Sequence, residues 1–138
     1  MNAREKIKEL HEIASKEDIE IIDIKGYNID SMSIQTDSGN CYIGIDGRNM
    51  TESEEVVHKA HELGHCMTGS FYNRYSKFDL ISKHERRADV WAIKKLVKED
   101  ELIDAFEHGI IEIWELAEYF DVTEEFMIKA CQYYGYLT

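Results

Sequence analysis

Apolar residues recur at helical spacing near the start of the chain, where Ile7, Leu10 and Ala14 share one face of a charged segment. This spacing predicts an amphipathic helix over residues 3–16 that packs across a sheet. Three short segments, rich in isoleucine or alternating between apolar and polar residues, then favour strands: residues 18–25, 31–36 and 41–46. The small polar residues at 37–40 are typical of a hairpin loop. We therefore expect a small three-stranded antiparallel sheet.

The second half of the chain is predicted to be helical. Thr51 and Glu54 have the spacing of a capping box, which starts a helix that runs to about Thr68. Residues 71–82 carry several aromatic side chains without a clear period, and we interpret them as a loop. Helical spacing then resumes over four further segments: residues 83–98, 101–108, 111–120 and 123–134. Together these elements predict a single α+β domain over residues 1–138.

The stretch His61-Glu62-Leu63-Gly64-His65 carries the most specific chemical pattern. Residues four apart lie on one face of a helix, about one turn apart, so the two histidines are predicted to point the same way. Two imidazoles at this spacing can ligate one Zn²⁺, while Glu62 reaches a water on the metal without itself being a ligand. The pattern predicts a zinc-dependent hydrolase in which Glu62 is the catalytic base.

The helix at 83–98 supplies candidates for the rest of a zinc site. Glu85 follows His65 by twenty residues and can complete a His-His-Glu ligand set that leaves the fourth position for water. Asp89 lies one turn later, where it can accept the other ring N–H of a ligand histidine. Three residues can assist at the oxyanion or contact the substrate, with a packing role as the alternative for each: Tyr72, Tyr75 and His84. His58 lies one turn before His61 and either lines the groove beside the zinc site or lies on the surface.

Three stretches of the sequence carry a family resemblance. Ala60–His65 reads A-H-E-L-G-H, Glu85–Ala92 reads E-R-R-A-D-V-W-A, and Leu116–Thr123 reads L-A-E-Y-F-D-V-T. They resemble the ImmA/IrrE family of zinc metallopeptidases, whose later motifs look like E-x-x-A-(N/D)-x-F-A and L-A-x-x-F-x-V-S. Trp91 stands where phenylalanine is common, and the proline that often follows the ligand helix is absent. The resemblance implies a zincin-type active-site helix with zinc on three residues and a catalytic glutamate: His61, His65 and Glu85, with Glu62.

Members of this family typically cleave a repressor of the helix-turn-helix type and are often encoded on phages or mobile elements. The resemblance implies the same substrate class here. An exposed edge strand offers unpaired N–H and C=O groups to an extended peptide, and residues 41–45 are our candidate for that strand. Proline at Ile43 should then abolish cleavage without unfolding the protein.

Acidic residues concentrate at the C-terminal end. From Glu99 onward eleven acids stand against one base, Lys129, so this part carries −10 of the formal charge of −12. We therefore divide the domain into a catalytic core (1–98) and a short acidic helical subdomain (99–138). Such a charge disfavours direct contact with nucleic acid and is compatible with a basic protein partner. Solvated faces of acidic helices are the simpler interpretation.

Two alternative functions belong to other classes. One is a metal-binding but non-catalytic regulatory protein, because a ligand pattern does not establish turnover. The other is a DNA-binding helix-turn-helix formed by residues 116–134. Its recognition helix would offer only Lys129 as a basic residue, against Glu124 and Glu125, and this charge disfavours it.

The cysteines and the apolar runs indicate a compartment. Cys41, Cys66 and Cys131 are odd in number and form no C-x-x-C pair, so we expect reduced thiols. No apolar run approaches the roughly 18 residues of a membrane span. Charged residues interrupt any apolar region within residues 1–10, unlike a signal peptide. A cytoplasmic protein without membrane contact is the resulting expectation.

Overall fold

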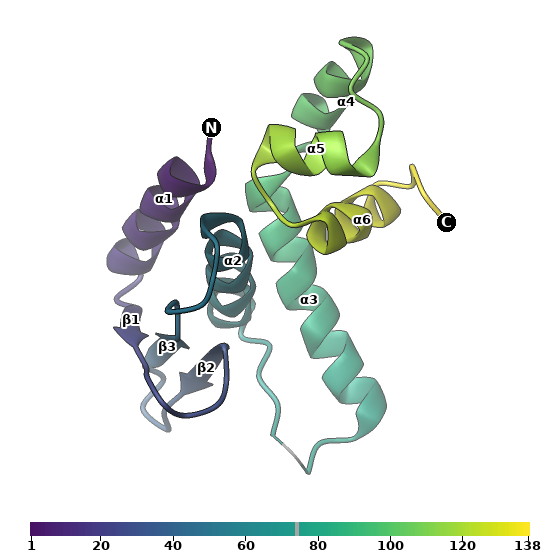
Figure 1. Ribbon diagram of the computed structural model, residues 1–138. Coiled ribbons are helices and arrows are strands. Elements are labelled where there is room, and N and C mark those ends of the chain that lie inside the picture. Colours follow the sequence, from purple (N-terminus) through teal and green to yellow (C-terminus); the bar gives the residue numbers. More distant parts are fainter. Residues whose placement is uncertain (74) are drawn as a thin grey trace.

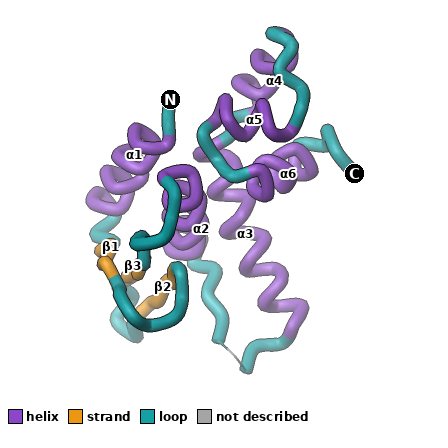
Figure 2. Tube along the Cα trace, viewed as in Figure 1, coloured by secondary structure: helices purple, strands orange, loops and turns teal. Residues whose placement is uncertain are grey.

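The chain folds into helices around one small sheet, as seen in a computed structural model that describes residues 1–73 and 75–138. Across these residues there are six helices and three strands (Figures 1 and 2). The predicted α+β class is confirmed, and no described helix is long and apolar enough to cross a membrane. In chain order the elements are α1 (Ala3–Lys16), β1 (Glu20–Asp23), β2 (Ser31–Gln35), β3 (Cys41–Ile45), α2 (Glu52–Thr68), α3 (Phe78–Leu96), α4 (Glu99–Glu107), α5 (Ile113–Phe120) and α6 (Glu124–Tyr133).

The sheet is mixed, which corrects the prediction of a purely antiparallel one. Its strand order is β1-β3-β2, with β3 antiparallel to β2 and parallel to β1. The hairpin between β2 and β3 forms as predicted, around Gly39 at φ 92°. β3 takes the centre because it is the most apolar strand, and its residues Cys41, Ile43 and Ile45 are all buried.

This strand order also makes our choice of edge strand wrong. β3 is paired on both sides, so residues 41–45 cannot add a peptide. The open edges are β1 and β2, and β2 lies beside α2. Backbone hydrogen bonds join Thr36 to Asn40 and Asp46 to Asp30 at 2.8 and 2.9 Å. Along an antiparallel pair, residues that hydrogen-bond to the partner strand alternate with residues whose N–H and C=O point away from it. Between Asp30 and Thr36, the residues of the second kind direct their N–H and C=O toward the open edge: Ser31, Ser33 and Gln35.

α2 and α3 form an antiparallel pair through the middle of the molecule (Figure 1). α2 starts with the predicted capping box, in which the Thr51 hydroxyl accepts from the Glu54 N–H at 3.1 Å. α3 begins at Phe78, before the predicted start at Lys83, so the interpretation of residues 78–82 as loop is wrong. The first turn of α3 is exposed, with Phe78 at 83%, and therefore has no buried face to set a period.

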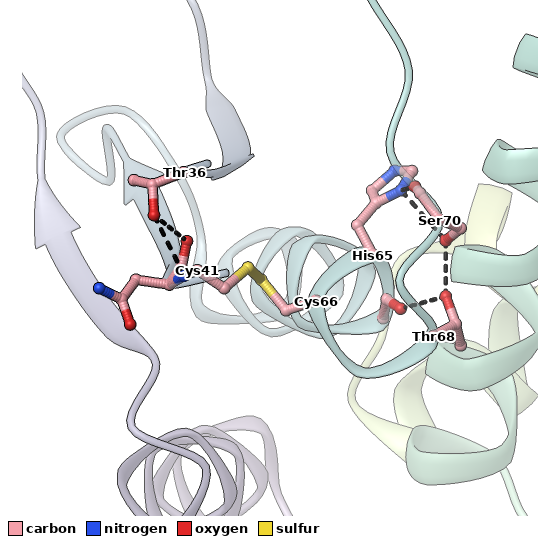
Figure 3. The surroundings of a disulfide bond; sticks show 8 residues. Thr36, Cys41, His65, Cys66, Thr68 and Ser70 are labelled. Carbon is pink, nitrogen blue, oxygen red and sulfur yellow. Dashed lines mark hydrogen bonds between the residues drawn. A yellow bond between two sulfur atoms is a disulfide. The ribbon is translucent and has the colours of Figure 1, made fainter. Parts of the chain in front are cut away.

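A disulfide joins the sheet to α2 (Figure 3). Cys41 at the start of β3 bonds to Cys66 in the last turn of α2, with their Cα atoms 6.1 Å apart. The expectation of reduced thiols is therefore wrong for this pair, whereas Cys131 is free and buried. The two cysteines lie 25 residues apart in sequence and meet because α2 packs on β3, which no local spacing indicates. The bond fixes the helix directly beside His65.

The N-terminal helix is tied to the C-terminal helices. Lys6 is 6% exposed, and its ammonium donates to the carbonyls of Leu96 and Phe120 at the C-terminal ends of α3 and α5. A cation is favoured there because helix C-termini carry partial negative charge. Asp121 accepts from the Ala3 N–H at 2.7 Å and also from a hydroxyl on α2. The division into residues 1–98 and 99–138 stays a prediction.

Candidate metal centre

The close approach of α2 and α3 builds the centre. The two helices meet at Gly64, where an added Cβ would lie 2.6 Å from the carbonyl oxygen of Ala88. With no side chain in the way, the antiparallel helices bring residues of the two motifs opposite one another. His61 lies against Asp89, and His65 lies against the carboxylate of Glu85.

His61, His65 and Glu85 converge on one point. One ligand atom from each lies within 4.8 Å of the others. His61 Nε2 is 3.2 Å from His65 Nε2 and 2.9 Å from Glu85 Oε2, and His65 Nε2 is 3.1 Å from Glu85 Oε1. Two imidazole nitrogens and a carboxylate are a donor set that divalent transition metals prefer. The three predicted residues are therefore brought together as a group that could hold a metal.

The outer nitrogens of both rings have acceptors, which fixes how the rings point. His61 Nδ1 lies 2.8 Å from Asp89 Oδ1, the contact expected for Asp89. His65 Nδ1 lies 2.5 Å from the carbonyl oxygen of Ser70 (Figure 3). A proton on each Nδ1 leaves the Nε2 lone pair free for a metal. This arrangement fits a metal site, since the rings are oriented before any ion is bound.

The sequence pattern does not predict the Ser70 carbonyl as a partner of His65. The chain reverses at Gly69, which has a left-handed backbone at φ 64° and carries the following carbonyl back to α2. Ser70 is fully buried, and its hydroxyl lies 2.5 Å from that of Thr68. The glycine that follows the motif helix in the sequence is the available signal for this reversal.

The charges at the centre shift the pKa values of its groups. Burial disfavours the charged imidazole of His61, but hydrogen bonds to Asp89 and Glu85 outweigh it and raise the His61 pKa to about 10. Hydrogen bonds from His61 and His65 hold the pKa of Glu85 far below its usual range. The Tyr72 hydroxyl donates to Glu85 Oε1 at 2.5 Å, and this bond raises the Tyr72 pKa to about 12. Tyr72, like an ordinary tyrosine, is protonated at neutral pH, and the shift only strengthens its hold on that proton.

Glu62 follows His61 on α2 and lines a cavity beside the ligand group. It is 7% exposed, and its Oε2 accepts from the Ser31 hydroxyl of β2 at 2.7 Å. The Ser31 oxygen also lies 2.9 Å from His58 Nδ1. The sequence predicts Ser31 in a strand and allows His58 either in the groove or on the surface. Only the packing of β2 on α2 brings these side chains to Glu62.

Cavities open on both sides of the ligand group. One of about 260 Å³ is lined by residues of β2 and by Glu62, His65 and Tyr72. The other, of about 330 Å³, lies toward α6 and is lined by His58 and Phe126 among others. His61 and Glu85 line both cavities, so the centre lies between them. Tyr75 is 79% exposed, and neither it nor His84 is among the described residues lining these two cavities.

The comparison with protein families matches residues 14–132 to the IrrE N-terminal-like domain, the peptidase M78 family. The chain belongs to this family. The match covers both helices of the ligand group and confirms the resemblance seen in the sequence. The comparisons find no significant match among curated proteins or solved structures. The protein is therefore a member of a metallopeptidase family that carries a His-His-Glu group able to hold a metal.

Proposed function

We propose that this M78 family member is a zinc-dependent metalloendopeptidase. The observation that carries the proposal is the convergence of His61, His65 and Glu85 within 4.8 Å, with Glu62 facing the same cavity. Two oriented imidazole nitrogens and one carboxylate suit Zn²⁺ and would leave a fourth ligand position open. The family match supports hydrolysis of peptide bonds as the reaction.

Each residue of the site has a role in this reaction. Zinc, when bound, polarises the scissile carbonyl and lowers the pKa of a coordinated water to about 7. Glu62 accepts the proton of the attacking water and passes it to the leaving amine. The Tyr72 hydroxyl, which donates to Glu85 Oε1 in this structure, would have to turn its one proton away from Glu85 to donate to the oxygen that becomes negative. Asp89 and the Ser70 carbonyl hold the ligand rings in place.

The proposed substrate is a helix-turn-helix transcriptional repressor, whose cleavage relieves repression. An extended segment of it would pair with the open edge of β2, beside Glu62. The acidic helices α4–α6 favour a basic partner through complementary charge. Direct DNA binding is disfavoured further because α6, the supposed recognition helix, lines the cavity beside the metal centre with Phe126 and Lys129.

Replacing Glu62 by glutamine is expected to abolish cleavage while zinc stays bound. Glutamine keeps the shape of the side chain but cannot accept the proton, so turnover should fall by roughly 10²–10⁴-fold. Zinc content by mass spectrometry should remain at one ion per chain, since Glu62 is outside the ligand group. The measurement is cleavage of a purified helix-turn-helix repressor, followed by gel and mass spectrometry.

The same experiment separates the peptidase from the non-catalytic alternative. A metal-binding regulatory protein would hold zinc equally well in both forms and would leave the repressor intact in both. If wild type and Glu62→Gln act alike on the repressor, the peptidase proposal is wrong. Removal of zinc by a chelator should stop cleavage by the wild type, and added zinc should restore it.

Zinc affinity is expected to rise with pH. With its pKa raised to about 10, His61 carries a proton on both ring nitrogens at neutral pH. The ring can ligate zinc only after Nε2 loses its proton. Apparent affinity should therefore increase about tenfold per pH unit below that value and then level off. Competition against a chelator of known pH dependence measures this. Asp89→Asn removes one of the contacts that raise the His61 pKa, so the pH at which zinc affinity levels off should fall. If that pH does not change, Asp89 does not raise the His61 pKa.

A further inference from the structure

A hydrogen-bond chain beside the metal centre ends on the proposed catalytic base. It runs from His58 on α2, through the Ser31 hydroxyl on β2, to the carboxylate of Glu62. His58 and Glu62 are four residues apart and therefore share one face of α2. Ser31 bridges them from the neighbouring strand, with 2.9 Å to His58 Nδ1 and 2.7 Å to Glu62 Oε2.

The direction of each hydrogen bond follows from the donors available. A serine hydroxyl has one proton, and an ionised carboxylate can only accept. Ser31 therefore donates to Glu62, and its oxygen accepts from a proton on His58 Nδ1. The chain assigns that proton in neutral His58 to Nδ1 rather than Nε2.

The bond from Ser31 distinguishes the two oxygens of Glu62. Oε2 accepts the serine proton, while no hydrogen bond from another described residue is directed at Oε1. Since Glu62 is 7% exposed, little water competes for Oε2, and a hydrogen bond to a buried carboxylate is strong. Oε1 is then the oxygen available to take the proton from the attacking water. A carboxylate held in this way does not have to be oriented during the reaction.

We propose that Ser31 and His58 are positioning residues for the catalytic base, an inference that rests on the proposed peptidase function. Ser31 begins the strand whose open edge would bind the substrate, so one strand both receives the peptide and orients Glu62. Neither Ser31 nor His58 hydrogen-bonds to the described ligand candidates, so they act on the base and not on metal binding.

Steady-state cleavage of the same repressor by the zinc-loaded protein is the first test. Ser31→Ala should lower kcat by about 10–100-fold, with KM and zinc affinity within about twofold of wild type. Ser31→Thr keeps the hydroxyl and should retain most of the activity. His58→Asn can present an amide N–H near the position of Nδ1, so the kcat of this variant should be higher than that of His58→Ala. The matched control is Ser38→Ala, which removes a hydroxyl from the exposed hairpin loop and should leave kcat unchanged.

The second test needs no turnover. Imidazole ¹⁵N NMR of the zinc-loaded protein should show the His58 proton on Nδ1 in the wild type and in Ser31→Thr. In Ser31→Ala that proton loses its acceptor. The His58 ring should then change tautomer, or its ¹⁵N signals should broaden by exchange between tautomers. Thermal unfolding of each variant checks that the fold is kept.

The outcomes separate the two proposals. A wild type that cleaves, with a Ser31→Ala kcat within about twofold of it, overturns the positioning role and leaves the peptidase intact. A wild type that does not cleave overturns the proposed function, and the NMR arm still decides the hydrogen-bond chain. A His58 proton on Nε2 in the wild type overturns the inference in either case.

Discussion

Replacing Glu85 by alanine is expected to weaken zinc binding by more than about 100-fold, because mutation of a partner that only supports a ligand already costs roughly 10–100-fold. Glu85 is the sole ligand candidate that α3 contributes to the described group, and it lies 2.9 and 3.1 Å from the two ring nitrogens. Without it, α2 alone would hold the ion through two histidines. Equilibrium competition with a chromophoric chelator measures the change, and cleavage should be lost in parallel.

Two further variants define what Glu85 contributes. Glu85→Gln keeps a carbonyl oxygen at the same place but removes the negative charge, so its zinc affinity should fall between wild type and Glu85→Ala. Asp79→Ala removes an exposed carboxylate from the first turn of the same helix and should bind zinc like the wild type. Equal affinity in Glu85→Ala and wild type would show that the third ligand has been assigned wrongly.

The parts of this molecule that local sequence predicts are those that depend on local physics. The capping box at Thr51 and the helical period of α2 involve neighbouring residues only, and both are found in the structure. His61 and His65 share a face because of helix geometry alone. Glu85 was identified from the chemistry that a two-histidine site lacks, and the antiparallel packing of α3 brings it to the site.

The predictions that failed concern features that depend on packing between segments distant in the sequence. Strand order followed from burial, which placed β3 in the centre and left β1 and β2 at the edges. The disulfide arose because Cys66 on α2 packs over Cys41 on β3. Ser31 reaches Glu62 across the same interface. None of these pairs has a sequence spacing that distinguishes it from any other pair, so a single sequence contains no signal for them.

Replacing Gly64 by alanine is expected to destabilise the protein by about 1–3 kcal/mol, against the usual effect of this change inside a helix. Alanine normally stabilises a helix by about 1 kcal/mol relative to glycine. Here the new Cβ would lie 2.6 Å from the carbonyl oxygen and 3.0 Å from the Cα of Ala88. These are backbone atoms, so no change of rotamer relieves the clash and the two helices must move apart.

That separation would also act on the metal centre, because α2 carries both histidines and α3 carries Glu85. Urea unfolding with and without zinc should therefore show a lower midpoint and a smaller gain from zinc in Gly64→Ala. Gly47→Ala is the matched control, since a Cβ there meets nothing closer than 3.8 Å, and its stability should change little. A Gly64→Ala protein as stable as wild type would mean that the helices can separate freely. The close contact would then not be what holds the ligands of the two helices together.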